Sequence, residues 1–372
     1  MKVRKLDLDN KKDINKFIQI PFDLYRDNDF WVPPMRSDMR AVMNKKTHPF
    51  YQHSDADFFI AEHNGQAVGR IAAISNTRSN RALDQNTAFF YFFESVNDSE
   101  VSEALFSEVF AWAKAHGHNQ VYGPKGLLQG DGIGLLVKGF DYIPAVGIPY
   151  NFPYYDELVK NSGFRKKFDY FSGFVDVEAG LSEKVRRVAE KVKERSGFWV
   201  REFKTKKELL SIAPELRQVY NAAFGGSEGF SPITEEEIIV IAKRILSIAD
   251  PRLIKLVYKN DRIIGFLFSY PNICRGLQKA NGRMWPFGWF HIMREFKTTK
   301  YMDANGIGIL PEYQGLGSTA VIYTEMEKTF REFNFEHVET VQTREDNTAS
   351  LGESSLFVMD WVKTHRIYDR DL

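Results

Sequence analysis

The stretch ILPEYQGLGSTAVIYTEMEK, residues 309–328, decides the fold of this 372-residue chain. It begins as an apolar strand, crosses a turn that holds Gly315 and Gly317, and continues with the apolar spacing of a helix. A tight turn needs one glycine at most, whereas a backbone that approaches a ligand closely needs more. Because the N-terminus of a helix carries unpaired N–H groups and a partial positive charge, this junction is predicted to hold a phosphate group.

A hairpin pattern occurs twice in the chain. Residues 58–76, FFIAEHNGQAVGRIAAISN, and residues 253–272, LIKLVYKNDRIIGFLFSYPN, each place two β-rich runs around a short polar turn. Three positions of the first hairpin match the second at one offset of 196 residues, Asn64, Gly69 and Asn76 against Asn260, Gly265 and Asn272. We therefore predict two copies of one αβ domain, with the boundaries 1–177 and 178–372.

Each copy continues with a strand, a junction and an amphipathic helix, and the junctions differ. In the first copy a strand over residues 88–96 is followed by a helix that Asn97 opens, with Glu100 in capping-box spacing. The equivalent strand of the second copy covers residues 304–310. The first junction, NDSEVSEAL, has no glycine and carries three acidic residues, which would repel an anion. The sequence therefore predicts a diphosphate site in the second copy alone.

The second junction resembles the cofactor loop of the GCN5-related N-acetyltransferase (GNAT) superfamily, whose signature is Gln/Arg-x-x-Gly-x-Gly/Ala at the start of a helix. Gln314 and Gly317 match the signature, and Thr319 stands where Gly or Ala is usual. Other stretches resemble tandem GNAT bacterial proteins of unassigned substrate, namely NDFWVPP (28–34), NFPYYDELVKNSGF (151–164), REDN (344–347) and HRIY (365–368). The resemblance implies an α/β (α+β) fold of two GNAT-like domains, each a mixed, mostly antiparallel sheet flanked by helices.

The same resemblance implies an acyl-CoA-dependent N-acyltransferase, with acetyl-CoA or another acyl-CoA as cofactor and a small-molecule amine as acceptor. The loop would bind the pyrophosphate of CoA, and the strand before it would pair through its backbone with the pantetheine arm. The residues implied for the cofactor are Ile307, Ile309, Gln314, Gly315, Leu316, Gly317, Ser318, Thr319 and Asn347. The first copy is implied to keep the fold without the pyrophosphate loop.

Acyl transfer to an amine requires the neutral amine, and deprotonating a lysine-like amine at pH 7 costs roughly 4–5 kcal/mol. We expect Glu339, in a strand over residues 337–343, to act as the base, with Asp346 second and His337 third. A strand Glu is also a common solvated edge charge, and Asp-Asn is a common turn. Many GNAT members protonate the leaving thiolate with a Tyr about seven residues past an Asn. Asn347 fits that Asn, but Ser354 stands at the Tyr position, so Tyr313, Tyr323 and Tyr368 are candidate substitutes.

Composition limits the partners. The chain has 50 basic and 49 acidic residues and a formal charge of +1, so no basic excess points to nucleic acid. Cys274 is the single cysteine, which excludes an internal disulfide framework and a Cys-based zinc cluster, and we expect no metal. We find no signal peptide and no membrane-spanning run, which predicts a cytoplasmic protein. The aromatic run MWPFGWFHIM, residues 284–293, indicates either core with a rigid loop, or an apolar channel or lipid-touching surface.

Three functions stay open at this point. The first is N-acyl transfer, with an acetyl group as the first expectation. The second is transfer of a long-chain acyl group to a lipid-like amine, which the aromatic clusters motivate. The third is a non-catalytic acyl-CoA-binding or scaffold protein, which the missing Tyr motivates. The acceptor, the acyl length, N- against O-acylation and the oligomeric state are open as well.

Overall fold

Two β-hairpins with the same turn geometry mark the two halves of the chain. The computed structural model describes residues 1–228, 230–347 and 357–372. In it, β2 (Asp55–His63) and β3 (Gln66–Ser75) form one hairpin, and β9 (Ile254–Lys259) and β10 (Arg262–Pro271) form the other. The first turn residues, Asn64 and Asn260, have φ values of 50° and 52°. Asparagine tolerates this left-handed conformation, which matches the twist of the flanking strands. The repeat predicted from the sequence is therefore present in the backbone.

By its internal contacts the chain divides into two compact units. Unit 1 consists of Met1–Tyr170, Cys274–Met293 and Lys363–Leu372, and unit 2 consists of Phe171–Ile273 and Arg294–Val362. The boundary predicted from the sequence, at 177/178, keeps each domain continuous. Here each unit is instead assembled from separate stretches of the chain, because unit 1 also takes in residues 274–293 and 363–372.

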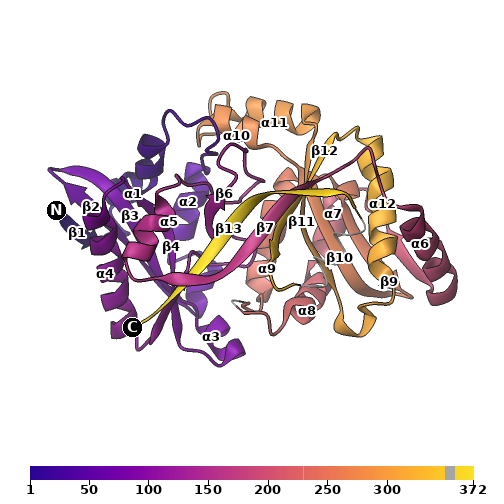
Figure 1. The fold of residues 1–372 in the computed structure, drawn as a ribbon, viewed down its shortest axis with the longest axis horizontal. Helices are drawn as coiled ribbons and strands as arrows, with labels where there is room; N and C mark the ends of the chain where they lie inside the picture. Colours follow the sequence, from indigo (N-terminus) through magenta and orange to yellow (C-terminus); the bar gives the residue numbers. More distant parts are fainter. Residues whose placement is uncertain (229, 348–356) are drawn as a thin grey trace. The chain divides into compact units, whose positions relative to one another are not determined.

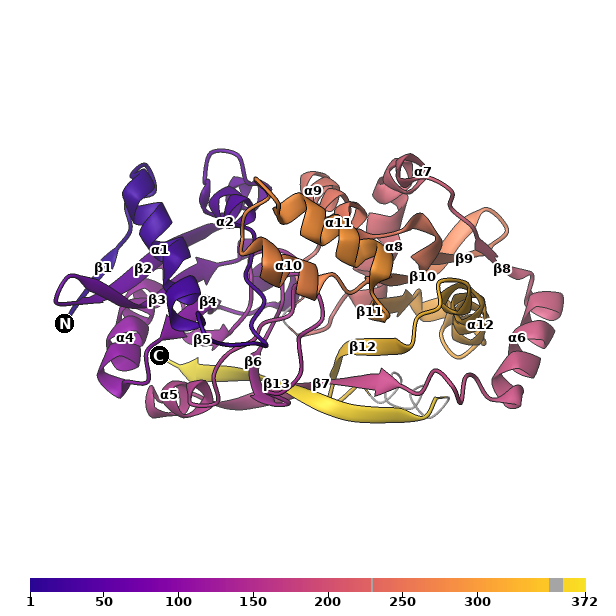
Figure 2. The ribbon, with the colours of Figure 1, turned by 90° about the horizontal axis from the view of Figure 1, so that it is seen from above.

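Unit 1 contains a sheet in the order β1-β2-β3-β4-β5-β13, in which β4 and β5 are parallel and the other neighbours are antiparallel. Figure 1 shows its elements and labels most of them, and Figure 2 also labels β5. Besides β2 and β3 they are β1 (Lys2–Lys5), α1 (Lys11–Leu24), α2 (Arg36–Met43), η1 (Pro49–Gln52), α3 (Thr77–Leu83), β4 (Thr87–Ser95), α4 (Ser99–Ala115), β5 (Gln120–Gly123), β6 (Leu135–Lys138), α5 (Tyr155–Asn161) and α10 (Cys274–Ala280).

Helices cover both faces of the unit 1 sheet. A Cβ atom on Gly69 would lie 2.8 Å from the side chain of Leu105 in α4, whereas Arg70 donates a hydrogen bond of 2.9 Å to the Phe17 carbonyl of α1. Consecutive strand residues point to opposite faces, so α4 and α1 lie on opposite faces (Figure 2). The apolar stripe of α4 predicted from the sequence is buried, as Val101, Leu105, Val109 and Trp112 show.

Unit 2 contains a sheet in the order β8-β9-β10-β11-β12, in which β11 and β12 are parallel and the other neighbours are antiparallel. Besides β9 and β10 its elements are α6 (Glu183–Ser196), β8 (Phe198–Arg201), α7 (Lys206–Ser211), α8 (Ala213–Phe224), α9 (Glu235–Ile248), η2 (Pro251–Leu253), β11 (Tyr301–Ile309), η3 (Pro311–Tyr313), α12 (Ser318–Glu332) and β12 (His337–Arg344). Three further elements contain residues of both units, namely β7 (Arg165–Val175), α11 (Gly288–Thr298) and β13 (Met359–Asp371).

The unit 2 sheet is also covered on both faces. A Cβ atom on Gly308 would lie 3.2 Å from Ala223 of α8. On β9, Lys255 donates a hydrogen bond of 2.7 Å to Thr329 of α12, and burial lowers the pKa of this lysine. Figure 2 shows α8 and α12 on opposite sides of β10. Both units therefore have the predicted architecture, a mixed and mostly antiparallel sheet flanked by helices.

Candidate functional site

The parallel strands β11 and β12 separate part-way along their length. Their register covers only residues 301–304 and 337–340, although β11 continues to Ile309 and β12 to Arg344. On its other edge β11 stays paired with β10 as far as Ile309. After Ala304, the edge of β11 that faces β12 is therefore no longer paired with β12. We call this opening the strand split.

A β-bulge lies where the strand split begins. Between the pairs Leu267–Ile307 and Ser269–Ala304, the two residues Asn305 and Gly306 oppose the single residue Phe268. Gly306 has a φ of 110°, and the Asn305 amide donates a hydrogen bond to the Tyr270 hydroxyl. Because a bulge bends its strand and re-aims side chains, this one directs β11 away from β12.

The loop between β11 and α12 suits an anion. Among the described residues no side chain caps α12, whose N-cap is Gly317 with a φ of 85°. Gly315 has a φ of 71°, and a Cβ atom added to it would meet no atom within 4 Å. The Gln314 side chain donates a hydrogen bond of 3.1 Å to the Ile309 carbonyl and so fixes the loop to the end of β11. Uncapped N–H groups beside open space are the features that a bound phosphate requires.

Gly317 has a second role that the sequence did not indicate. A Cβ atom there would lie 2.6 Å from the Val192 side chain of α6. Substituting Gly317 would therefore disturb the packing of α6 on α12 as well as the loop. The neighbouring Ser318 is buried, and Leu316 is 52% exposed. Gly315 is consequently the cleaner position at which to test the loop.

The equivalent junction of unit 1 is capped by an acid. The N-cap of α4 is Asp98, and its carboxylate accepts a hydrogen bond of 2.9 Å from the Glu100 N–H. The sequence-based prediction that Asn97 opens this helix is wrong by one residue, because Asp98 has the extended backbone and the carboxylate that reach the first turn. A fixed negative charge therefore occupies the N-terminus of α4.

The strand split of unit 1 is closed by the chain itself. β4 and β5 pair over residues 87–89 and 120–122, and beyond them the Lys125 N–H donates a hydrogen bond of 2.9 Å to the Phe90 carbonyl. A Cβ atom on Gly123 would lie 2.6 Å from the same carbonyl. The buried Lys125 ammonium lies 5.8 Å from the centre of the Phe89 ring, and burial lowers its pKa to about 8. The backbone edge that is open in unit 2 is thus occupied in unit 1.

Three polar side chains form a row across the unit 2 sheet at the closed end of the strand split. Tyr270 of β10 is the register partner of Asp303, and Asp303 is the register partner of Glu339 in β12. Register partners lie on the same face, and all three residues are buried. The Asn272 amide donates a hydrogen bond of 3.0 Å to the Asp303 carboxylate. We call Tyr270, Asp303 and Glu339 the polar row.

The polar row lies on the α8 face of the sheet. Phe268 and Phe266 precede Tyr270 at alternate positions of β10. The Phe266 ring stacks on Tyr220 of α8, with ring centres 5.6 Å apart. Since every second strand residue shares a face, Tyr270 faces the same side as Phe266. The α12 loop opens at the other end of β11, so a ligand held at the loop and lying in the strand split would extend toward the polar row.

Unit 1 has apolar and aromatic residues at the positions of the polar row. The corresponding register runs Ile74–Phe89–Tyr122, and all three side chains are buried. The rings of Phe89 and Tyr122 lie 5.6 Å apart. The two units therefore share a backbone but differ in the chemistry of this one row.

The predicted site residues are distributed between three places. Glu339 is buried in the polar row, whereas the Asp346 side chain is 59% exposed and forms an ion pair with Arg344. Asn347 closes a turn after β12 with a hydrogen bond of 3.0 Å from its N–H to the Arg344 carbonyl. Parallel strands end at the same edge, so Asn347 and Gln314 follow neighbouring strand ends. Ser354 lies outside the described residues.

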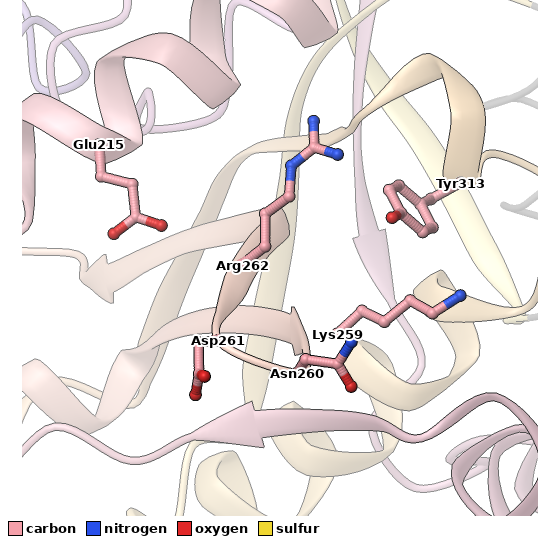
Figure 3. A pocket seen from close by; sticks show the side chains of 6 residues that line it. All are labelled: Glu215, Lys259, Asn260, Asp261, Arg262 and Tyr313. Carbon is pink, nitrogen blue, oxygen red and sulfur yellow. The ribbon is translucent and has the colours of Figure 1, made fainter.

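Tyr313 lies at the tip of the β9–β10 hairpin. Its ring centre is 6.0 Å from the ring of Phe198 and 5.5 Å from the Lys259 ammonium. A pocket of about 500 Å³ opens here (Figure 3). Its lining comprises Glu215, Lys259, Asn260, Asp261, Arg262 and Tyr313. Tyr313 therefore packs beside the hairpin and Phe198 of β8, and among the described residues no hydrogen bond, ion pair or ring contact joins it to Glu339.

Sequence reasoning missed Tyr270, Asp303 and Asn305. A signal for Tyr270 was present, because the 196-residue offset between the hairpins aligns it with Ile74, whereas Asp303 aligns with Phe89 only through the strand register. The constant offset ends after the hairpin, since α10 and α11 lengthen the connection between β10 and β11. The alignment of β4 with β11 is recovered only from the register.

Neither a membrane-spanning helix nor a metal-binding cluster occurs among the described residues. No helix among them is long and apolar enough to cross a membrane. No group of three or more His, Cys, Asp or Glu side chains among them is arranged to hold a metal ion.

Comparison with known proteins places the chain beside two curated relatives and a set of solved structures. No protein-family model matches it. Protein YghO of Escherichia coli (strain K12) is 24% identical over 370 residues, which cover 98% of this chain and 94% of that protein. The bacterial ceramide synthase of Caulobacter vibrioides is 24% identical over 367 residues, which cover 97% of this chain and 95% of that protein. A tandem GNAT protein from the clavulanic acid biosynthesis pathway aligns over 100% of this chain and 98% of its own, with a TM-score of 0.57 and 10% identity.

Proposed function

We propose that this chain, which has the tandem GNAT fold, is an acyl-CoA-dependent N-acyltransferase whose unit 2 binds the cofactor and carries the chemistry. One observation carries the proposal. Unit 2 has an uncapped helix N-terminus, an open strand split and a buried polar row, and at each of the three equivalent places unit 1 has a capping acid, a closed split and apolar or aromatic side chains.

The loop and the strand split would hold the cofactor. The backbone N–H groups of residues 315–319 would bind its diphosphate, and each hydrogen bond to a charged group contributes about 1.5–3 kcal/mol. The edge of β11 at Ile307 and Ile309, where the Ile309 carbonyl also accepts the Gln314 hydrogen bond, would pair with the pantetheine arm. When bound, an acyl-CoA supplies an acyl group activated as a thioester.

The polar row would remove the proton that makes an amine unreactive. A carboxylate placed near the acceptor takes this proton directly or through one water, an effect worth about 10²- to 10⁴-fold in rate. We assign the role to Asp303, with Glu339 beside it, because Asp303 is oriented by the Asn272 amide. Neither Asp346, which is exposed, nor Tyr313, which faces the hairpin, is as well placed.

Tyr270 is our candidate for the proton donor to the leaving thiolate. Its hydroxyl accepts a hydrogen bond from the Asn305 amide in the bulge, and its backbone position is paired with that of Asp303. A phenolic O–H group can donate its proton as well as accept a hydrogen bond. Tyr270→Phe keeps the ring and removes this proton, so it should slow turnover without weakening CoA binding.

A thiol-release assay with a panel of primary amines tests the proposal. Turnover that falls at least about 10²-fold in Asp303→Asn, with CoA affinity retained in calorimetry, is the expected result. CoA binding without turnover on any amine would instead support the non-catalytic acyl-CoA-binding protein. Absence of CoA binding would refute both.

A second candidate is transfer of a long-chain acyl group to a lipid-like amine. Two observations favour it, the name of the Caulobacter relative as a ceramide synthase and the exposed aromatic residues between Met284 and Met293. The two versions differ in acyl length. Palmitoyl-CoA should then give the higher kcat/KM with a long-chain amine, and equal rates for acetyl-CoA and palmitoyl-CoA would contradict the lipid version.

A further inference from the structure

We propose that residues 284–293 and a basic pocket beside them in unit 1 form a surface that docks on an anionic phospholipid bilayer. We call the first feature the aromatic segment and the second the basic pocket. The inference does not depend on the acyltransferase proposal, because it concerns a different part of the chain and is tested by binding alone.

Exposed apolar side chains are concentrated in the aromatic segment. Of the thirteen large apolar side chains that are exposed among the described residues, six fall within these ten positions. Scattered exposed apolar residues are ordinary, whereas a contiguous group marks an interaction surface. The six are Met284 (45% exposed), Trp285 (77%), Phe287 (69%), Trp289 (44%), Phe290 (49%) and Met293 (49%). The structure therefore contradicts a core role for this run.

The backbone of the aromatic segment is held in place although its side chains are exposed. The Trp289 N–H donates to the Met284 carbonyl at 2.9 Å, and the Trp289 indole N–H donates to the Pro286 carbonyl at 3.1 Å. A Cβ atom on Gly288 would lie 1.8 Å from the Arg283 carbonyl, so the turn into α11 requires glycine. Because this backbone is already ordered, the segment loses little backbone conformational entropy on binding.

The segment is fastened to the rest of unit 1 at its beginning. The Gln278 side chain in α10 donates a hydrogen bond of 2.8 Å to the Asp29 carbonyl, and the Arg36 N–H donates one of 3.0 Å to the Gly282 carbonyl. Figures 1 and 2 both show α10 and α11 lying next to each other. These hydrogen bonds therefore fix the position of the aromatic segment relative to the rest of unit 1.

The basic pocket opens directly beside this attachment. It has a volume of about 800 Å³ and shares Met284 and Trp285 with the aromatic segment. No carboxylate is found among the described residues that line it, whereas five cationic side chains are: Lys12, Lys16, Arg36, Arg40 and Arg283. Burial, together with the guanidinium groups of Arg283 and Arg40, lowers the pKa of Arg36. The only charged groups of the described lining are therefore positive, and the neighbouring acids, Glu62 at Lys16 and Asp23 near Arg36, lie outside the lining.

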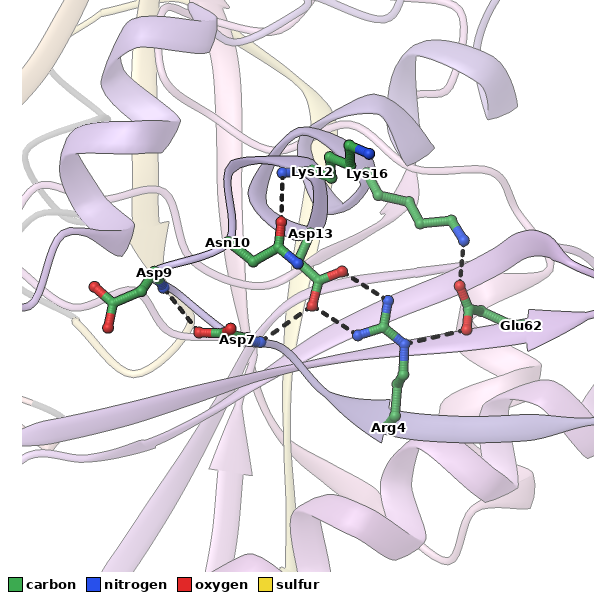
Figure 4. Close-up of polar contacts among 8 residues, drawn as sticks. All are labelled: Arg4, Asp7, Asp9, Asn10, Lys12, Asp13, Lys16 and Glu62. Carbon is green, nitrogen blue, oxygen red and sulfur yellow. Dashed lines mark hydrogen bonds and ion pairs between the residues drawn. The ribbon is translucent and has the colours of Figure 1, made fainter.

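Two of these cations are free to meet a ligand. Figure 4 shows that Lys16 is paired with Glu62, which Arg4 also contacts, while the Lys12 ammonium points away from the acids drawn. In the part of the chain that the structure describes, neither Lys12 nor Arg283 forms an ion pair. Unpaired cations beside exposed aromatic rings are complementary to a lipid headgroup phosphate above acyl chains.

A bilayer surface fits this combination better than a protein partner. Tryptophan is enriched at membrane–water interfaces, and helices with aromatic residues on one face and Lys or Arg beside them lie in the plane of the interface. Each basic residue near an anionic bilayer strengthens binding by about fivefold. A partner protein or a second copy of the chain would need an acidic and apolar counterpart of matching shape.

The test is flotation of the full-length protein with phosphatidylcholine vesicles that contain or lack phosphatidylglycerol. Wild-type protein should float with the anionic vesicles, and the binding should weaken as the screening length falls from about 10 Å at 0.1 M salt to about 3 Å at 1 M. Trp285→Ser/Phe287→Ser should lower the partition coefficient at least about tenfold. Lys12→Glu/Arg283→Glu should lower it at least about fivefold for each charge.

Matched control variants distinguish vesicle binding through this surface from nonspecific hydrophobic adsorption and nonspecific charge attraction. Lys184→Glu/Lys191→Glu reverses the same number of charges at exposed positions of α6, and Val240→Ser/Val358→Ser removes exposed apolar side chains elsewhere. Both controls should float like wild type. Unchanged flotation of Trp285→Ser/Phe287→Ser, or equal losses in the controls, would overturn the proposal. So would a wild-type dimer in light scattering that Trp285→Ser/Phe287→Ser dissociates without lipid, because a second copy would then cover the segment.

Discussion

Replacing Gly315 by Ala and, separately, by Asp distinguishes the shape of the cofactor loop from its charge. Gly315 has a φ of 71° and open space where a Cβ atom would stand. Both variants therefore carry a backbone penalty of up to about 1–2 kcal/mol, and this penalty is no larger for Asp than for Ala. Only the Asp variant adds a negative charge where the diphosphate of CoA is expected.

The size of the charge effect follows from Coulomb's law. Two unit charges 4 Å apart near a protein surface interact by about 4 kcal/mol, and an Asp side chain that rotates away retains about half of this. Gly315→Asp should therefore bind CoA about 30- to 700-fold more weakly than Gly315→Ala. The two variants should have similar melting temperatures. In effect the substitution gives unit 2 the acidic junction that Asp98 provides in unit 1.

Isothermal titration with CoA measures this difference, and thermal unfolding confirms that both variants fold. Asp98→Asn is the control in unit 1, because Asn also caps a helix but carries no charge. It should leave CoA affinity unchanged and should create no second binding site. Equal affinities of folded Gly315→Ala and Gly315→Asp would refute the assignment of the loop.

Two further predictions concern buried ionisable groups. Asp303→Asn and Glu339→Gln should each lower the rate of thiol release, Asp303→Asn by about 10²- to 10⁴-fold, while calorimetry finds CoA affinity within about twofold of wild type. Burial lowers the pKa of Lys125 from 10.5 to about 8. The free-energy cost of burying the charged ammonium is therefore fully present below pH 8 and disappears as the pH rises to 10.5. Lys125→Met should therefore be about 3 kcal/mol more stable than wild type at pH 7, and denaturant titrations should show this gain shrinking toward pH 10.5. A gain independent of pH would contradict the buried-ammonium account.

The parts of the fold that depend on local chemistry were predictable from the sequence. The hairpins follow from asparagine in left-handed turns, and the apolar stripe of α4 follows from helical spacing. The N-terminus of α4 was misplaced by one residue, since Asn97 and Asp98 are both good caps and only the backbone decides between them. Patterns within about ten residues thus carried most of this information.

The features that separate the two units required the three-dimensional structure. Closure of the unit 1 split depends on a hydrogen bond between Lys125 and Phe90, which are far apart in the sequence. The polar row depends on the register of three strands, and a single Asp in an apolar strand produces no periodic pattern from which it could be predicted. Gly317 matched the cofactor signature, but its contact with α6 arises from tertiary packing. Long-range contacts of this kind leave no trace in a local pattern.

A crystal structure of the full chain with bound CoA tests the central claim most directly. The account predicts one CoA molecule in each chain, with its diphosphate on the backbone N–H groups of residues 315–319 and its pantetheine arm along β11. CoA bound at the Asp98 end of α4, or a second molecule in the β4–β5 region of unit 1, would contradict it.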